Sequence, residues 1–223
     1  MFGDLRVVDD VPEAFASAVI DAYGRRTHAD LFTLALSGGD TARHCYEALA
    51  RQADDHIDWF NVDVYWGDER CVPSDSPDSN ERLGREALLE RVGGVHAVHP
   101  MRCEDGADRY HLLVGEVGQF DVVHLGVGPD GHTASLFPQS PALSADPGRL
   151  VAMNHDPNGH NPFERMTLTF SGISRARLVV FTVAGDGKRD AMERIAAGED
   201  LPAARVRADE VLWLVDGAAA PRH

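Results

Sequence analysis

The chain has 223 residues, of which 43% are hydrophobic and 26% charged, and its formal net charge is −15 at pH 7. These proportions are typical of a folded globular protein and exclude disorder over the whole chain. No apolar run approaches the roughly 20 residues that a membrane-spanning helix needs, and we expect neither a signal peptide nor a membrane partner. Because the negative charge repels a phosphate backbone, we also expect no nucleic-acid binding.

Short apolar strands alternate with amphipathic helices along most of the chain. Apolar residues at helical spacing, such as Val11, Phe15 and Val19, predict helices. The predicted helices cover residues 11–26, 41–51, 79–92, 107–117 and 187–197. Short apolar runs bounded by glycine predict buried strands. The predicted strands cover residues 31–36, 62–66, 120–126, 166–170, 178–183 and 211–215, and a proline-rich, irregular stretch precedes the fourth of them.

This alternation indicates βαβ units. We therefore expect an α/β fold: a mainly parallel sheet covered by helices on both faces, a Rossmann-like three-layer sandwich with some antiparallel strands. No linker or repeat is visible, so residues 1–223 are expected to form a single domain. Ligands of such sheets bind beyond the carboxyl ends of the strands. The loops after Leu36, Trp66, Leu125 and Val183 are therefore expected to form one site.

The cysteines and histidines point to no cross-link and no metal. Cys45, Cys71 and Cys103 are odd in number and lack a zinc-type spacing. We expect no disulfide framework and a reducing, cytoplasmic location. The eleven histidines are scattered, so we expect neither a metal site nor a cofactor.

The first glycine loop, Ser37-Gly38-Gly39-Asp40-Thr41, lies between a predicted strand and a predicted helix. Glycine N–H groups and a helix N-terminus can together bind a phosphate. The same residues could instead form only a tight turn, with Asp40 or Thr41 capping the helix. The segment matches neither the dinucleotide nor the nucleoside-triphosphate loop pattern, so neither of those ligands is predicted.

Charged residues follow the next two strands. Asp68 and Arg70 can bind a substrate or transfer a proton, or they can form an ordinary surface ion pair. The glycine-rich segment 126–138 contains Asp130 and His132. Histidine titrates near neutrality and suits general acid–base catalysis, and Asp130 can hold its ring in one tautomer. The alternative is a structural histidine that caps the following helix.

Two further cations are candidates for anion binding. Lys188 follows a strand and opens a helix, where its ammonium group can point at an anion. An exposed lysine is the alternative. Arg165 immediately precedes the predicted strand at 166–170. Cys71 stands beside Arg70, but no partner base is visible, so we do not expect it to be a nucleophile.

Five segments, in order, resemble motifs of the 6-phosphogluconolactonase family. They are SGGDT at 37–41, WGDERCVP at 66–73, GVGPDGHTASLFP at 126–138, RMTLT at 165–169 and the segment around Lys188. The resemblance covers essentially the whole chain. It implies hydrolysis of 6-phospho-D-glucono-1,5-lactone to 6-phosphogluconate in the oxidative pentose phosphate pathway, without a cofactor or a metal.

The resemblance also implies roles for individual residues. His132 takes a proton from the attacking water and is held by Asp130, while Arg70 stabilises the oxyanion or holds a substrate hydroxyl. The residues expected to bind the substrate and its phosphate are Ser37, Gly38, Gly39, Asp40, Thr41, Asp68, Arg165 and Lys188. We expect a monomer or a small homo-oligomer.

Two alternatives stay open. The wider superfamily includes the glucosamine-6-phosphate isomerases and deaminases, which would use a carboxylate base such as Asp68. In that branch a tyrosine stands at the position of Arg70 and a glutamate at that of Phe137, so the residues present favour the lactonase. The second alternative is a non-catalytic sugar-phosphate sensor, against which Arg70 and His132 together argue.

The first glycine loop departs from the family's usual SGGSTP. Asp40 replaces the small residue and Ala42 replaces the proline. A carboxylate facing a bound phosphate would weaken affinity, so we expect Asp40 to cap the helix instead.

Overall fold

The computed structural model describes residues 2–26, 31–53 and 55–222. Its main sheet has seven strands in the order β1-β10-β9-β6-β2-β3-β5, and every neighbouring pair runs parallel. These strands are β1 (Asp4–Val7), β2 (Phe32–Leu36), β3 (Val62–Trp66), β5 (Ala97–His99), β6 (Phe120–Leu125), β9 (Ala176–Val183) and β10 (Glu210–Val215). A small antiparallel sheet joins β4 (Asp68–Arg70), β8 (Arg165–Leu168) and β7 (Val151–Asn154).

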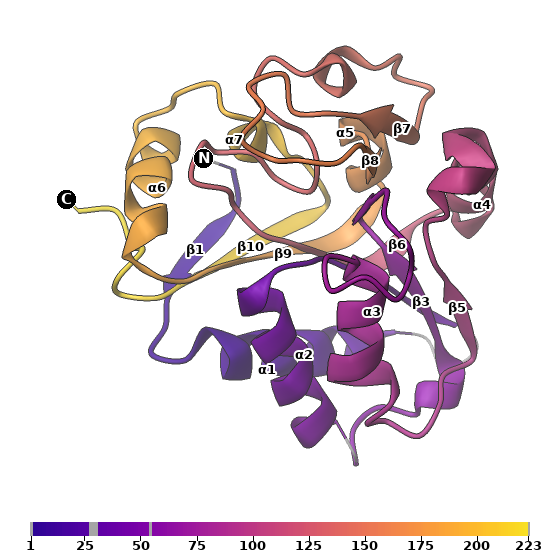
Figure 1. Cartoon of the computed structure of the whole chain (residues 1–223). Coiled ribbons are helices and arrows are strands. Elements are labelled where there is room, and N and C mark those ends of the chain that lie inside the picture. The colour runs from indigo at the N-terminus through magenta and orange to yellow at the C-terminus, as the bar shows by residue number, and fades with distance from the viewer. Residues whose placement is uncertain (1, 27–30, 54, 223) are drawn as a thin grey trace.

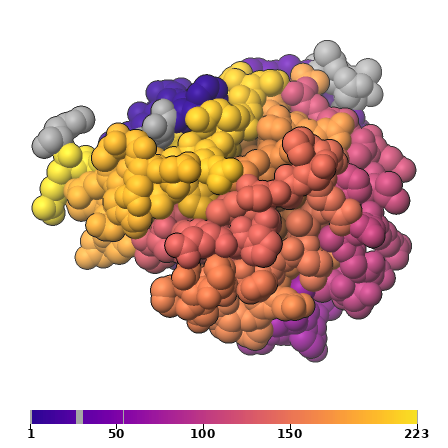
Figure 2. All heavy atoms as spheres, turned by 90° about the horizontal axis from the view of Figure 1, so that it is seen from above, coloured from indigo at the N-terminus to yellow at the C-terminus, as the bar shows by residue number. Residues whose placement is uncertain are grey.

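Helices and the small sheet cover the main sheet on its two faces. The helices are α1 (Val11–Arg25), α2 (Asp40–Gln52), α3 (Asn80–Gly84), α4 (Gly106–Val117), α5 (Phe170–Ile173), α6 (Arg189–Ala196) and α7 (Pro202–Arg205). In Figure 1, α1, α2 and α3 lie on one side of the sheet, and α4, α5 and the small sheet lie on the other. Seen from the latter side, the surface is formed mainly by the second half of the chain (Figure 2). The predicted three-layer α/β fold is therefore confirmed, with its antiparallel strands in the small sheet.

The apolar patterns explain the elements that the sequence predicts. In α1, Val11, Phe15, Val19 and Tyr23 follow one another at four-residue intervals and are all buried. The carboxylate of Asp10 accepts a hydrogen bond from the first turn of this helix. In β2 four of the five residues are buried, as its continuous apolar run predicts. Burying one such aliphatic side chain contributes about 1.5–3 kcal/mol, so these faces fix the layers.

Four strands, β1, β4, β5 and β7, were not predicted. Each has only three or four residues, which is too short for an alternation or an apolar run to predict a strand, and β1 and β5 are half-exposed to exposed along their length. Among the described residues, no helix has the length and apolarity needed to cross a bilayer.

The helix predicted at 79–92 begins as expected and then changes its geometry. The Ser79 hydroxyl accepts a hydrogen bond from the Arg82 N–H, which makes Ser79 the N-cap of α3. The chain continues after Gly84 as a π-helical turn, Arg85–Leu89. The side chains of Leu36 and Trp66 lie against Gly84, where a Cβ would meet Leu36 at 2.9 Å.

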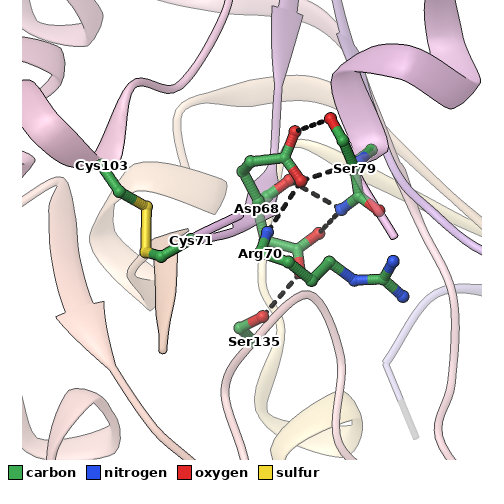
Figure 3. The surroundings of a disulfide bond; sticks show 8 residues. Asp68, Arg70, Cys71, Ser79, Cys103 and Ser135 are labelled. Carbon is green, nitrogen blue, oxygen red and sulfur yellow. Dashed lines mark hydrogen bonds between the residues drawn. A yellow bond between two sulfur atoms is a disulfide. The ribbon is translucent and has the colours of Figure 1, made fainter. Parts of the chain in front are cut away.

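Cys71 and Cys103 form a disulfide, so the expectation of no disulfide is wrong for this pair. The two cysteines are 32 residues apart in the sequence, and only the tertiary fold brings their loops together. Cys71 follows β4 and Cys103 follows β5. Figure 3 shows the bond between their two sulfur atoms. Cys45 is buried and is a free thiol.

Removing this cross-link is expected to lower the free energy of unfolding by about 3–4 kcal/mol, because closing a loop of this length restricts the unfolded chain. Urea unfolding with and without a phosphine reductant measures the difference. A Cys71→Ser/Cys103→Ser variant is the control, since the reductant has no bond to break in it. Identical unfolding midpoints for the wild type in both conditions would contradict the prediction.

Candidate active site

The loops after β2, β3, β6 and β9 meet at the carboxyl edge of the main sheet, where they line one pocket of about 280 Å³. The lining residues are Ser37, Gly38, Gly39, Asp68, Arg70, Asn80, Gly126, Val127, Gly128, Pro129, His132, Ala134, Asn161, Arg165 and Lys188. All four loops that the sequence singles out therefore contribute to one hollow. A larger hollow of about 650 Å³, beside β1 and β10, contains none of these side chains.

His132 is held on the loop after β6 by Asp130. The Nδ1 of His132 lies 2.5 Å from Oδ1 of Asp130, and the same oxygen accepts the backbone N–H of His132 at 3.1 Å. An ionised carboxylate accepts at this distance, so Nδ1 carries the proton and Nε2 carries the lone pair of the neutral ring. Burial alone would raise the pKa of Asp130, but the hydrogen bonds and charge of His132 outweigh it and hold that pKa below 3.8.

The ring of His132 has a fixed place in the loop. It packs against Phe137, with the ring centroids 4.9 Å apart. On its other side lies Gly128, where a Cβ would stand 2.1 Å from the imidazole. Only glycine at this position leaves room for the ring, and the Gly128 N–H also donates to the carbonyl of His132. The glycine-rich sequence before His132 therefore positions the histidine.

The first glycine loop rests on a buried polar chain. The Ser37 N–H donates to the Tyr46 hydroxyl at 2.6 Å, and that hydroxyl lies 2.8 Å from Nδ1 of His124. Nε2 of His124 lies 2.8 Å from the Thr182 hydroxyl. Burial lowers the pKa of His124 to about 3, so the ring is neutral and links Tyr46 to Thr182 as acceptor and donor. These contacts hold Ser37 in place, next to the two glycines that line the pocket.

Asp68 connects the second loop to the histidine loop. Its Oδ2 accepts the Ser135 hydroxyl at 2.6 Å, and its backbone carbonyl accepts the side-chain amide of Asn80 at 2.9 Å. Ser135 follows His132 by three positions, so Asp68 joins the strand end of β3 to the loop after β6. Figure 3 shows Asp68 facing Ser135, with Arg70 beside it.

Three cationic side chains converge on the pocket. Arg70 and Arg165 are directly paired across β4 and β8, an arrangement that like charges disfavour unless an anion lies between them. Arg165 is 6% exposed, and its buried Nε has no hydrogen-bond partner within the described part of the chain. Burial lowers the pKa of Arg165 and that of Lys188. The negative charge of Asp130 raises the pKa of Lys188 but does not outweigh its burial. These cations favour an anionic ligand in a chain that is strongly negative overall.

Two expected binding residues, Asp40 and Thr41, do not line the pocket. They begin α2, and Gly39 stands at its N-cap without any side-chain cap. The expectation that Asp40 caps the helix is therefore wrong, and its side chain is exposed. The reason is that the chain enters α2 one residue earlier than predicted, so Asp40 already has a helical position.

Sequence reasoning missed several residues at or under the pocket. Tyr46 and His124 lie within a helix and a strand, where an apolar pattern hides a polar contact. Asn161 lies in the irregular stretch. Lys188, by contrast, was predicted from the sequence, and it is the only lysine in a chain that otherwise uses arginine. Among the described residues, no three histidine, cysteine or acidic side chains gather as metal ligands do.

Comparison with known proteins places this pocket in a family. A model described as "Glucosamine-6-phosphate isomerases/6-phosphogluconolactonase" matches residues 6–213. The chain belongs to this family. A relative from Synechocystis, a 6-phosphogluconolactonase, is 41% identical over 206 residues, which is 84% of this chain and 82% of that protein.

Solved structures of the family agree with the fold. The 6-phosphogluconolactonase of Thermotoga maritima has a TM-score of 0.82 at 29% identity, covering 95% of this chain and 98% of its own. A monomeric glucosamine-6-phosphate deaminase has a TM-score of 0.81 at 19% identity, covering 97% of this chain and 98% of its own, and so shares the fold. The fold is therefore common to both branches of the family, and the side chains of the pocket must distinguish them.

His124 is expected to make stability depend on pH. The unfolded chain protonates this histidine near its ordinary value of 6.5, whereas the folded chain does so only at about 3. Between these values the unfolded state binds more protons, so stability falls as the pH falls, with a slope approaching about 1.4 kcal/mol per pH unit.

Urea unfolding of the wild type and of His124→Gln at several pH values between about 4 and 7 measures this slope. Glutamine keeps a donor and an acceptor but does not titrate, and all other groups are common to both proteins. We expect a flatter pH dependence for the variant. Parallel curves for the two proteins would show that His124 is not the buried neutral group described above.

Proposed function

We propose that this protein hydrolyses 6-phospho-D-glucono-1,5-lactone to 6-phosphogluconate, the reaction named for its 6-phosphogluconolactonase relatives. The observation that carries the proposal is His132, oriented by Asp130, in one pocket with Arg70, Arg165 and Lys188. A histidine base beside a cluster of cations suits an anionic ester that water attacks. The pathway is then the oxidative pentose phosphate pathway.

The first step is attack by water on the lactone carbonyl. Nε2 of His132 takes a proton from the water as its oxygen bonds to the carbonyl carbon, and Asp130 stabilises the imidazolium that forms. The carbonyl oxygen becomes an oxyanion, which Arg70 stabilises if the carbonyl lies beside it. When the tetrahedral intermediate collapses, the bond to the ring oxygen breaks and His132 returns its proton to that oxygen. The products are a free carboxylic acid and a hydroxyl group, and the base is restored.

The phosphate of the substrate occupies the other side of the pocket in this proposal. Gly38 and Gly39 line the pocket immediately before α2, and their N–H groups bind the phosphate there. Lys188 supplies a full positive charge, and the buried, unpartnered Nε of Arg165 can donate to the same group. Ser37 fixes the start of this loop, and Asp68 orients the segment between the two ends of the substrate.

The isomerase or deaminase alternative is less consistent with the pocket. A base must be free to reach the substrate, but both oxygens of Asp68 have neighbours in the protein: Ser135 at 2.6 Å and Asn80 at 3.3 Å. Phe137 is buried against His132, at the position where that branch has a glutamate. A non-catalytic sensor would have no need of a histidine oriented by a carboxylate.

We further propose one domain, a monomer or small homo-oligomer, no nucleic-acid partner, and no cofactor or metal requirement. The pairing of β1 with β10 supports a single domain, because both ends of the chain then belong to one sheet. The net charge of −15 supports the absence of nucleic-acid binding. We also propose a cytoplasmic location, on the basis of the metabolic pathway; the Cys71–Cys103 disulfide is unusual for such a compartment.

Replacing His132 by alanine is expected to lower kcat by about 10²–10⁴-fold, because the water loses its base. The His96→Ala variant is a matched control: His96 also pairs with a carboxylate, Asp63, at 2.6 Å, but it lies outside the pocket. Acid release from lactone generated in situ, corrected for spontaneous hydrolysis, measures both. A near-normal kcat for His132→Ala would remove this histidine from the mechanism.

Replacing Lys188 by alanine is expected to raise KM by about 10–100-fold with little change in kcat, as loss of phosphate binding predicts. The next residue offers the control, since the guanidinium of Arg189 bonds the carbonyls of Gly217 and Ala220 away from the pocket. Steady-state kinetics of Lys188→Ala and Arg189→Ala test the assignment. Equal KM values for the wild type and Lys188→Ala would place the phosphate elsewhere.

A further inference from the structure

We propose that Glu69 is a positioning residue of this active site, whose buried carboxylate holds Arg70 and Asn80 in the places that substrate binding and turnover require. The proposal rests on the proposed function, because it concerns the same pocket. Glu69 does not line that pocket, and its carboxylate points away from the substrate side. It would therefore act through its neighbours.

The carboxylate of Glu69 gathers four donors from two segments of the chain. Oε1 accepts the N–H groups of Arg70 and Asn80, both at 2.7 Å. Oε2 accepts the N–H of Glu81 at 2.7 Å and the Ser79 hydroxyl at 3.1 Å. Figure 3 shows Ser79 at the start of its helix facing the strand that carries Asp68 and Arg70. Glu69 thus joins the end of β4 to the first turn of α3.

Only an ionised carboxylate satisfies this arrangement. Each oxygen faces two donors, so a glutamine would turn its own NH₂ group toward two N–H or O–H groups. Glu69 is 4% exposed, and this burial raises the pKa of its carboxyl above 4.5, against the lowering effect of the N–H donors. Burying a charge costs free energy, so this carboxylate is not expected to add much to the stability of the fold. Its four hydrogen bonds instead fix the places of the residues that donate them, which points to positioning.

Asn80 transmits the position of Glu69 to two other loops. Its side-chain NH₂ donates to the backbone carbonyl of Asp68 at 2.9 Å and approaches the Asp68 carboxylate at 3.3 Å. These two acceptors fix which end of the amide is the NH₂ group. The remaining oxygen, Oδ1, then lies against Gly38, where a Cβ would come within 1.9 Å of it. Moving Asn80 would therefore disturb Asp68 and the first glycine loop together.

Glu69, which we call the anchor, influences Arg70 both at its backbone and at its guanidinium. Its backbone N–H is bound to Glu69, and its guanidinium Nη1 donates to the carbonyl of Asp78 at 2.6 Å. Asp78 immediately precedes Ser79, the residue whose hydroxyl Glu69 accepts. Losing the carboxylate would loosen the loop that holds the guanidinium as well as the strand that carries it.

A neighbouring acid provides a matched control. Glu81 lies one residue after Asn80 and is also buried, at 5% exposed. Its carboxylate pairs with Arg85 and Arg102, on the side of α3 away from the pocket. Glu81→Gln removes a buried charge from the same helix without touching Arg70 or Asn80. It separates loss of a buried acid from loss of the anchor.

The test compares Glu69→Gln and Glu81→Gln in kinetics and in amide hydrogen exchange. We expect Glu69→Gln to lower kcat/KM for the lactone by about 10–100-fold, since small displacements of substrate-positioning groups have effects of this size. The amides of Arg70, Asn80 and Glu81 should exchange at least about tenfold faster in it. Glu81→Gln should keep kcat/KM within about threefold of the wild type.

A double-mutant cycle distinguishes positioning from general loss of structure. If Glu69 acts through Arg70, the loss of kcat/KM caused by Glu69→Gln should be at least about threefold smaller in an Arg70→Ala background. Equal losses in both backgrounds, or a Glu69→Gln enzyme with normal kcat/KM, would overturn the proposal. If Glu69→Gln does not fold, Glu69→Asp keeps the charge and shortens the reach by one methylene, and the same criteria apply to it.

Failure of the proposed function would be recognised separately. A wild type that does not hydrolyse the lactone would refute the proposed function. Hydrogen exchange would still test whether Glu69 holds Arg70 and Asn80 in place. Faster exchange of the Arg70 and Asn80 amides in Glu69→Gln would then support it. Unchanged protection of these amides would refute the anchor whatever the activity.

Discussion

Parallel pairing of the seven main strands is the constraint on which the site depends. Every crossover returns the chain to the same end of the sheet, so the loops after β2, β3, β6 and β9 must meet at one edge. Residues as distant in sequence as Gly38 and Lys188 thereby share a pocket. The small sheet adds β4 and β8 above that edge, which brings Arg70 opposite Arg165. The pocket is thus a product of topology first and of side chains second.

Two buried polar side chains outside the pocket then hold the loops that line it. The neutral imidazole of His124 supports the first glycine loop through Tyr46, and the carboxylate of Glu69 supports the second loop through Asn80. Neither group lines the pocket. Glu69 accepts backbone N–H groups at the start of α3 that would otherwise be free. His124 acts one step further back, since it contacts the Tyr46 hydroxyl that accepts the Ser37 N–H.

The sequence was informative where a feature is local and less so where it depends on contacts across the fold. The strand at 62–66 and the loops around Ser37 and His132 follow from apolar runs and glycines. The short strand β7 and the disulfide between Cys71 and Cys103 do not, because pairing partners far along the chain create them. Glu69 is visible as a charge in the sequence, but its role depends on a turn that brings α3 back over β4. The resemblance to known motifs singled out Arg70, His132 and Lys188, which line the pocket, without showing what holds them.

The most direct test of the account compares two substrates of the family with the wild-type protein. Acid release from freshly generated 6-phosphogluconolactone and ammonia release from glucosamine 6-phosphate would be followed at the same pH, each against a blank without protein. The account predicts lactone hydrolysis well above the spontaneous rate and no release of ammonia. Lactone hydrolysis at the blank rate, together with deamination of glucosamine 6-phosphate, would contradict it and assign the pocket to the other branch of the family.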